Sequence, residues 1–309
     1  MKVAVLGSSG EIGGKVVEEL LSDGVDVRRG LRTGAGAPHF DISDRTGATR
    51  LIAWADVVVD ATPSWVCNPV VTRALEHVPV VSTGHVAIAG QALHVSCAGA
   101  LPGVLTGVPL LLPRRDRKVV SRTMISTPLS RSAARDMLQG ARRGPGAVIR
   151  RDVRMPLLDA EVDLVGYADT DTALIDGRFA HPVEWWSAWA GRRFRDALFS
   201  AVGMDPDQAA SVLSAAAGNG VVPGCEVLAH ATDGIDEVGV RVASMTTLCA
   251  AMAVSCVKVL GGLGTAGMTA LPQQLTALDL LLRTGTAVGQ VIETAGGVIT
   301  RAPDEEGEL

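Results

Sequence analysis

The glycine-rich turn at residues 7–13 constrains this chain more than any other feature. It reads Gly7-Ser8-Ser9-Gly10-Glu11-Ile12-Gly13 and follows directly on a short apolar run at residues 3–6. Such a run is typical of a parallel strand that is buried on both faces. Apolar residues then recur at helical spacing over residues 12–21, and Asp23-Gly24 ends this segment before a second strand at residues 25–30. The pattern predicts a βαβ unit.

The turn has the composition of a dinucleotide-binding loop. Glycines at positions 7, 10 and 13 let backbone N–H groups approach a pyrophosphate, while the helix that follows directs its positive N-terminal end at the same anion. A preceding strand and a following helix are the context that this motif requires. The alternative is a tight turn without a ligand. We expect the cofactor to contact Gly7, Ser9, Gly10, Glu11, Ile12 and Gly13.

The end of the second strand distinguishes the two nicotinamide cofactors. An acidic residue there binds the ribose 2'-hydroxyl, whereas an arginine accommodates the 2'-phosphate of NADP. Asp26 lies too early, inside the strand, and the strand end is followed by Arg32 and Thr33. We predict that Arg32 and Thr33 bind the 2'-phosphate, with Arg29 as the second candidate, so that the cofactor is NADPH. Three solvated arginines on a loop are the alternative.

The alternation of strands and helices continues to about residue 96. Strand candidates at 57–60, 78–82 and 92–96 are separated by helical patterns at 46–55 and 66–76, which predicts a doubly wound parallel sheet of the Rossmann α/β class. Ligands bind beyond the carboxyl ends of such strands. For Pro63 and Gly84 taken alone, ordinary turn chemistry is the better interpretation. The further cofactor contacts expected at these strand ends are Asp41, Ile42, Ala61, Thr62, Pro63 and Gly84.

A chain of 309 residues predicts two domains. We place a Rossmann domain at residues 1–117 and an α+β domain for substrate binding and dimerisation at 118–262. Residues 263–301 are expected to return to the Rossmann domain, and the acidic tail at 302–309 to be disordered. Within the second domain, residues 148–155 read as a strand and 242–261 as a buried helix.

Composition excludes several partners. A net charge of -5 supplies no basic face for nucleic acid or for an anionic membrane. The longest apolar stretch carries Pro102 and Pro109, which interrupt any continuous membrane-spanning helix. The N-terminus enters a strand without a signal peptide, and the five cysteines form no C-x-x-C pair. We therefore expect a soluble, cytoplasmic protein with reduced thiols.

Several common mechanisms do not fit the sequence. Short-chain dehydrogenases use a tyrosine with a lysine four positions later, but the single tyrosine, Tyr167, is followed at that spacing by Asp171. The six histidines show no metal-ligand spacing, so no catalytic metal is expected. Neither a G-x-S-x-G elbow nor a P-loop occurs.

The chain resembles the saccharopine dehydrogenase-like reductases. Besides the glycine turn, Ser-Cys-Ala-Gly-Ala-Leu-Pro-Gly at 96–103 is similar to the family's glycine-x-x-proline-glycine turn. Residues 129–135 resemble its entry into the second domain, and 264–282 its closing glycine turn and helix. The resemblance implies a two-domain NAD(P)-dependent reductase of an imine or of a related C=N or C=C bond. Because the chain is much shorter than the lysine-pathway enzymes, saccharopine itself is not the expected substrate.

Catalytic candidates concentrate in residues 166–185. His181 is our first choice for the proton donor, with Asp171 and Tyr167 as further catalytic candidates, although a histidine before proline is often structural. Arg178 can pair with a substrate carboxylate or take part in a surface ion pair. Trp185, Trp186 and Trp189 are spaced for one helical face, which favours a core or subunit-interface role over a wall of the substrate site. The apolar second domain favours a homodimer.

The sequence therefore leads to an NADPH-dependent reductase of a small C=N or C=C substrate in specialised metabolism. A regulatory protein that senses NADP(H) without catalysis is the main alternative. An enzyme that retains the cofactor for structure or for epimerisation is another. The sequence leaves both open.

Overall fold

The computed structural model describes residues 1–31, 39–41, 44–63, 69–84, 88–127, 129–131, 133–135, 149–155, 157, 160–189, 192–201, 203–217 and 224–301. The chain divides into two compact units. Unit 1 comprises Met1–Val104 and Thr246–Val291, and unit 2 comprises Leu105–Met245 and Ile292–Leu309. The acidic tail, for which we expect disorder, lies outside the described residues.

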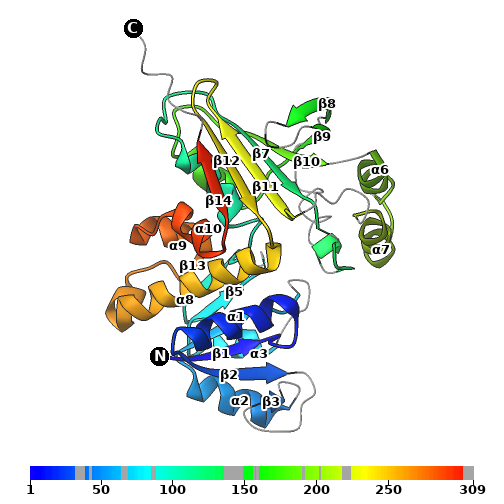
Figure 1. Cartoon of the computed structure of the whole chain (residues 1–309). Coiled ribbons are helices and arrows are strands. Elements are labelled where there is room, and N and C mark those ends of the chain that lie inside the picture. The colour runs from blue at the N-terminus through cyan, green and yellow to red at the C-terminus, as the bar shows by residue number, and fades with distance from the viewer. Residues whose placement is uncertain are drawn as a thin grey trace. The chain divides into compact units, whose positions relative to one another are not determined.

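Unit 1 is built on a seven-stranded sheet in the order β13-β6-β5-β4-β1-β2-β3 (Figure 1). Each neighbouring pair is parallel. The order 3-2-1-4-5-6 is that of a doubly wound Rossmann sheet, so the predicted fold class is confirmed. The strands are β1 (Lys2–Leu6), β2 (Asp26–Leu31), β3 (His39–Asp41), β4 (Val57–Asp60), β5 (Val80–Ser82), β6 (His94–Ser96) and β13 (Gln274–Thr276).

Among the described residues, six α-helices include residues of unit 1, and local side chains fix where two of them begin. Asp44 accepts hydrogen bonds from the N–H groups of Thr46 and Gly47 at the start of α2, and Thr276 accepts one from Asp279 at the start of α9. These caps satisfy donors that a helix leaves unpaired. The helices are α1 (Glu11–Ser22), α2 (Arg45–Trp54), α3 (Pro69–Ala74), α8 (Met245–Thr269), α9 (Ala277–Thr284) and α10 (Val288–Thr294), whose last residues belong to unit 2.

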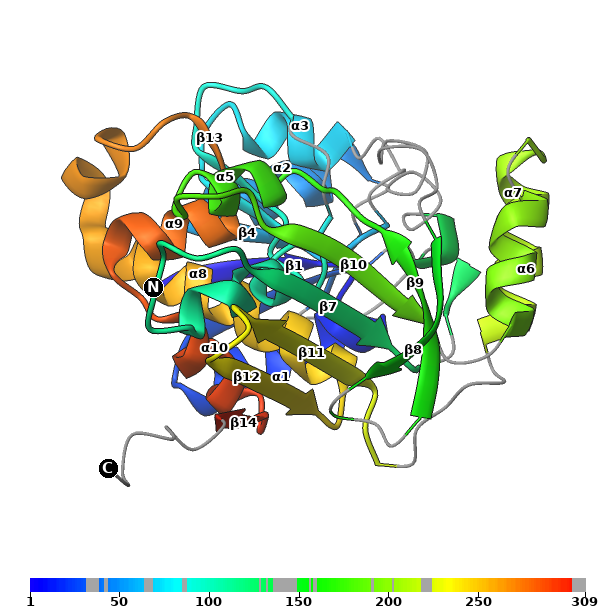
Figure 2. The same ribbon diagram turned by 90° about the horizontal axis from the view of Figure 1, so that it is seen from above.

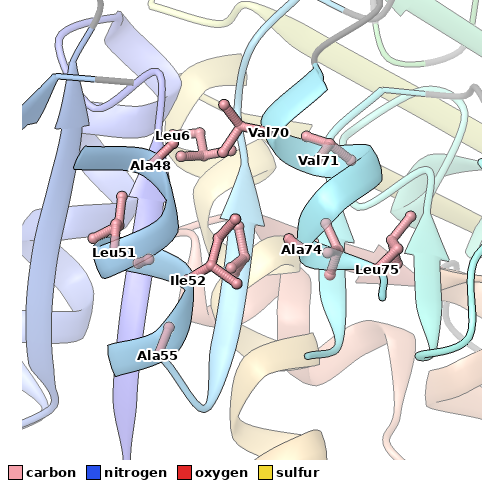
Figure 3. Close-up of a cluster of buried hydrophobic side chains, with 12 residues drawn as sticks. Leu6, Ala48, Leu51, Ile52, Ala55, Val70, Val71, Ala74 and Leu75 are labelled. Atoms are coloured by element: carbon pink, nitrogen blue, oxygen red, sulfur yellow. The ribbon is translucent and has the colours of Figure 1, made fainter. Parts of the chain in front are cut away.

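One face of the Rossmann sheet is covered by α2 and α3. Figure 3 shows Leu51 and Ile52 of α2 on one side of the buried cluster and Val71 and Ala74 of α3 on the other. Leu6 of β1 belongs to the same cluster. Burial of these aliphatic side chains supplies the main favourable free energy for this layer, at about 25 cal/mol per Å² of apolar surface.

The helix α8 is apolar on every side, as the sequence predicts for residues 242–261. Leu248, Met252 and Leu260 are fully buried. Among the described helices it is the one long and apolar enough to cross a membrane, with 56% of the relevant window buried in the structure. Our expected domain limits placed this segment in the second domain, but the chain returns to unit 1 at Thr246. A largely apolar helix is stable where most of its side chains are buried, as most of those from Leu248 to Leu260 are.

Unit 2 is built on a mixed seven-stranded sheet in the order β14-β12-β11-β7-β10-β9-β8. β7 and β10 are parallel and the other neighbours are antiparallel; β7, β10, β11 and β12 lie side by side in Figure 2. The second α+β domain is therefore confirmed as a fold. Its elements are η1 (Val104–Leu111), β7 (Val120–Ile125), β8 (Ile149–Met155), β9 (Ala160–Gly166), α5 (Thr172–Asp176), β10 (Glu184–Trp189), α6 (Arg192–Ala201), α7 (Pro206–Ala217), β11 (Val227–Thr232), β12 (Glu237–Val242) and β14 (Val298–Arg301).

Three features of unit 2 differ from the sequence predictions. Unit 1 ends at Val104 rather than near residue 117, and β14 at 298–301 pairs with β12 instead of returning to the Rossmann sheet. The prediction of a helix for the tryptophan-rich segment is wrong, because Glu184–Trp189 forms strand β10. Aromatic residues favour strands, and adjacent strand residues point to opposite faces. Trp186 is thus buried, while the Trp185 indole donates to Asp176.

Candidate functional site

The glycine turn of unit 1 adopts a conformation that only small residues permit. Gly7 has a φ of 74°, and a Cβ atom there would lie 2.9 Å from the Ala61 carbonyl oxygen. A Cβ at Gly13 would lie 2.2 Å from the Gly7 carbonyl oxygen, well inside van der Waals contact. The first turn of α1 is thereby held directly against the turn that precedes it. Both positions require glycine because of backbone atoms rather than side chains.

The outer part of this turn, residues 9–11, is exposed. Gly10 is the N-cap residue of α1 and makes no side-chain cap, while its own N–H donates to the Gly7 carbonyl oxygen at 2.9 Å. Ser9, Gly10 and Glu11 are exposed, whereas Ser8 is buried and its hydroxyl donates to the Gly30 carbonyl oxygen at 3.4 Å. The N-terminus of a helix with exposed N–H groups is suited to an anion such as a pyrophosphate. These residues fit the group that the sequence predicts.

The loops beyond the carboxyl ends of the parallel strands are joined by one repeated hydrogen bond. Ala61 N–H donates to the Leu6 oxygen at 3.1 Å, and Thr83 N–H to the Asp60 oxygen at 2.9 Å. Ala98 N–H then donates to the Ser82 oxygen at 2.9 Å. Each loop is thus bonded to the last residue of the neighbouring strand. This series aligns the ends of β1, β4, β5 and β6 along one edge, where Rossmann folds bind ligands.

The strand-end residues that the sequence predicts lie along this edge. Ala61, Thr62 and Pro63 follow β4 and are half-buried, and Gly84 follows β5. Thr62 donates to the Asp60 carboxylate through its N–H at 3.1 Å and through its hydroxyl at 2.5 Å. Burial raises the pKa of Asp60, while the Thr62 hydrogen bonds oppose that shift. Asp60 is a member of this edge that the sequence pattern did not single out as a site residue.

The residues expected to choose between NAD and NADP are described in part. Arg32, Thr33 and Ile42 lie outside the described residues, and Asp41 ends β3. Within β2, the Arg28 guanidinium stacks over the Trp54 ring at 4.1 Å from its centroid. Arg29 alternates with Arg28 along β2 and therefore lies on the opposite face of the sheet. Of the arginines expected to bind a 2'-phosphate, Arg29 is the one that the structure describes.

The segment at 96–103, which carries part of the family resemblance, forms a tight turn after β6. Gly103 has a φ of 131°, and a Cβ there would lie 2.2 Å from the Gly99 carbonyl oxygen. Cys97 has a positive φ of 58°, and its N–H donates to the Gly84 carbonyl oxygen at 2.7 Å. The hydrogen bond holds the turn against the loop after β5. Position 103 requires glycine because of its positive φ and because a side chain there would overlap the Gly99 carbonyl oxygen.

Unit 1 contains two sets of side chains of the types used as nucleophiles, the Ser82–His94 pair and two buried cysteines, but their surroundings do not activate them. His94 Nδ1 accepts the Ile88 N–H at 2.9 Å, so in the neutral imidazole Nε2 carries the proton and donates to the Ser82 hydroxyl at 2.9 Å. Burial lowers the pKa of His94, which favours this neutral form. A histidine in this tautomer does not deprotonate Ser82. Burial also raises the pKa of Cys249 to about 11 and that of Cys256 to about 12, so neither supplies a thiolate.

In unit 2, the carboxylate of Asp169 is the centre of a hydrogen-bond network. Its Oδ2 accepts from the Tyr167 hydroxyl and from the Thr106 hydroxyl, the latter at 3.0 Å. Its Oδ1 accepts from the N–H groups of Asp171 at 2.8 Å and Thr172 at 2.9 Å. Burial raises the pKa of Asp169, and these hydrogen bonds oppose the shift. The network joins η1 to the loop between β9 and α5.

The three predicted catalytic residues are only partly brought together. The Tyr167 hydroxyl and the Asp171 backbone N–H both bond to Asp169, whereas His181 lies exposed in the turn before β10. Arg178 is also exposed. Asp169 and Thr106 are absent from the predicted set, because sixty-three positions separate them in the chain and no local spacing links them. Asp169 alone carried a local signal, since an aspartate can accept the N–H groups two and three residues later, here those of Asp171 and Thr172 at the start of α5.

Comparisons with known proteins add little to this geometry. No family model matches the chain, and no curated protein matches its sequence. A short-chain dehydrogenase/reductase superfamily protein from Agrobacterium tumefaciens with bound NAD is 18% identical over 26% of this chain, at a TM-score of 0.22. The chain spans only 32% of that protein's length.

Two other solved structures are matched over most of the chain. DAP dehydrogenase from C. glutamicum in complex with DAP is 14% identical, with 90% of this chain and 93% of that chain covered and a TM-score of 0.47. Dipicolinate-bound dihydrodipicolinate reductase from Paenisporosarcina sp. TG-14 is 12% identical, with 90% and 98% covered and a TM-score of 0.39. Scores this low carry no functional argument. The resemblance to saccharopine dehydrogenase-like reductases stays a prediction.

Proposed function

We propose that the protein is a NADPH-dependent reductase of a small molecule with a C=N or C=C bond. The observation that carries the proposal is the glycine turn at residues 7–13. Its close backbone contacts, the exposure of Ser9, Gly10 and Glu11, and its place between β1 and α1 support a pyrophosphate site at the centre of a Rossmann sheet. A nicotinamide cofactor bound there supplies a hydride when it reacts.

The preference for NADPH over NADH rests on the arginines near the end of β2. Arg29 is the described candidate and Arg32, with Thr33, the predicted one. A guanidinium pairs with a phosphate through charge-assisted hydrogen bonds, and β2 ends without an acidic residue to hold a ribose hydroxyl. The 2'-phosphate of NADPH is therefore the group that this strand end favours.

The cofactor assignment is tested by titrating the pure protein with NADPH and with NADH. We expect tighter binding of NADPH, and Arg29→Ala and Arg32→Ala should each weaken NADPH binding while leaving NADH binding unchanged. Arg50→Ala, an exposed arginine on α2, serves as the matched control. Equal affinities for the two nucleotides would contradict the NADPH preference. Failure to bind either would contradict the whole proposal.

The reaction is tested by following NADPH oxidation against two panels of substrates. The first contains imines formed from amino acids and keto acids, and the second contains enoyl compounds. Turnover with a member of either panel supports the reductase and identifies the bond that is reduced. Tight NADPH binding without turnover on both panels would instead favour a protein that senses the cofactor.

A further inference from the structure

The carboxylate of Asp60 in unit 1 is joined to the glycine turn by two short contacts. Its Oδ1 accepts the Thr62 N–H at 3.1 Å, and the Thr62 nitrogen lies 3.2 Å from the place that a Cβ atom would take at Gly7. The Ala61 carbonyl oxygen lies 2.9 Å from the same place. The backbone that Asp60 holds is therefore the backbone against which the first glycine of the turn packs.

We propose that binding of the cofactor pyrophosphate at the glycine turn is coupled to the uptake of a proton by Asp60. This inference rests on the proposed function, because it needs a dinucleotide at that turn, and it adds a form of regulation to the same site. The protein binds its cofactor more tightly as the pH falls. Asp60 is a positioning residue that acts through Thr62 and through its charge, without touching the cofactor.

The described neighbours of Asp60 leave its negative charge uncompensated. Leu6 on β1 and Ser82 on β5 are paired with Asp60 in the sheet, so the three side chains lie on one face. The residues of α2 and α3 in the buried cluster on that face are apolar. The Ser82 hydroxyl bonds to His94, which is neutral because burial lowers its pKa. The glycine turn adds the exposed Glu11, so none of these described neighbours is positively charged.

A bound pyrophosphate would add negative charge close to this carboxylate. Burial raises the pKa of Asp60, because the ionised form loses contact with water, while the Thr62 hydrogen bonds oppose the shift. Like charges repel over a Debye length of about 10 Å at 0.1 M salt, which exceeds the two short contacts between Asp60 and the turn. Pyrophosphate at the turn therefore raises the pKa of Asp60 further. By linkage, protonation of Asp60 raises the affinity for pyrophosphate by the same factor.

The two oxygens of Asp60 differ in their readiness to take this proton. Oδ1 accepts hydrogen bonds from the N–H and from the hydroxyl of Thr62. Both are donors to this oxygen, so the proton is directed to Oδ2. It comes from solvent and forms an O–H bond there, and no bond of the cofactor is made or broken. The Thr62 contacts that support the turn are kept in both protonation states.

Calorimetry of NADP⁺ binding in two buffers of different ionisation enthalpy counts the protons taken up, without turnover. Between about pH 5 and pH 8, wild type should show a maximum of proton uptake that Asp60→Asn lacks, because an amide keeps the acceptor for Thr62 but takes no proton. At the upper end of this range Asp60→Asn should bind NADP⁺ about 10-fold more tightly than wild type, which corresponds to one unit of pKa. The 2'-phosphate of NADP⁺ titrates equally in both proteins, so their difference belongs to Asp60.

Asp56→Asn is the matched control. Asp56 directly precedes β4, about 13 Å from Asp60 along the strand, and its carboxylate accepts the Lys2 N–H at 2.8 Å. This variant should keep the proton uptake and the affinity of wild type. A loss of uptake in Asp56→Asn equal to that in Asp60→Asn would overturn the assignment to Asp60.

Thr62→Val tests the coupling with the carboxyl group in place. Valine keeps the N–H donor and removes the hydroxyl donor, so the pKa of Asp60 should rise and the maximum of proton uptake should move to higher pH. An unmoved maximum, or equal uptake in wild type and Asp60→Asn, would overturn the coupling alone. Failure of the wild-type protein to bind either NADP⁺ or NADPH would overturn the proposed function together with the coupling.

Discussion

The two units hold their candidate sites by different means. In unit 1 the glycine turn is shaped by close contacts between backbone atoms, and Gly7 and Gly13 are required because any side chain there would overlap those atoms. In unit 2 the network is made by the side chain of Thr106 on η1 and those of Tyr167 and Asp169 on the loop between β9 and α5. Substitution in unit 1 should therefore act through steric overlap. Substitution in unit 2 should act through charge and hydrogen bonding, with little change in shape.

The largest effect is expected for Gly13→Ala. Its methyl group would lie 2.2 Å from the Gly7 carbonyl oxygen, so α1 must move away from the turn. We expect a loss of more than about 3 kcal/mol of stability and the loss of NADPH binding. Urea unfolding and nucleotide titration measure the two effects.

Gly14→Ala provides the matched control for that substitution. Its methyl group would lie at an ordinary contact distance of 3.6 Å from the Ser8 oxygen. Alanine inside a helix is favoured over glycine by about 0.5–1 kcal/mol. Gly14→Ala should therefore stabilise α1 and bind NADPH normally. Equal losses in both variants would break the steric account of unit 1.

Leu51→Ala tests whether a loss of core packing in unit 1 lowers stability without lowering the affinity for NADPH. Leu51 is fully buried in the cluster between α2, α3 and the sheet, and its truncation should cost about 3 kcal/mol. Because Leu51 packs in the buried cluster and is not one of the residues of the glycine turn, the folded fraction should still bind NADPH with wild-type affinity. Leu21→Ala, at a half-exposed position, should change stability little. A large fall in affinity in Leu51→Ala would show that the site depends on the whole core.

Arg115→Gln makes the corresponding test in unit 2. The Arg115 guanidinium donates to the carbonyl oxygens of Leu110 and Leu112 at the end of η1 and stacks over Phe179 at 4.9 Å. Losing these contacts should cost about 1–2 kcal/mol. Hydrogen exchange should place the loss in unit 2. Arg114→Gln, at an exposed position, is the control; a loss spread equally over unit 1 would contradict separate units.

The smallest effect concerns pH and Asp60. Burial raises the pKa of Asp60 in the folded protein, so the folded state holds this proton more tightly than the unfolded chain. Stability should therefore fall as the pH rises from the ordinary aspartate range through the raised pKa. Asp60→Asn keeps an acceptor for Thr62 and should flatten that part of the stability curve. Urea unfolding at several pH values measures it, and an unchanged slope would contradict the assignment.

Local patterns predicted the Rossmann sheet well because each of its strands and helices has its own hydrophobic pattern within a few consecutive residues. The strand at 57–60 is found at those residues, and the glycine turn joins β1 to α1 as predicted. The helix α8 was predicted as a buried segment, but its unit was not. The hydrophobicity of a helix predicts that it is buried, but it does not predict which residues of the chain bury it.

The sequence by itself determined the glycine turn, since the need for glycine at positions 7 and 13 arises within a few residues of chain. The tertiary structure decided that the tryptophan segment is a strand, because pairing with β7 and β9 outweighs a spacing that also fits a helix. It also decided that Asp169 accepts hydrogen bonds from Tyr167 and Asp171, while His181 lies exposed in a turn. A hydrogen bond between Thr106 and Asp169 exists only once distant segments have packed together, and no periodicity in the sequence reports it.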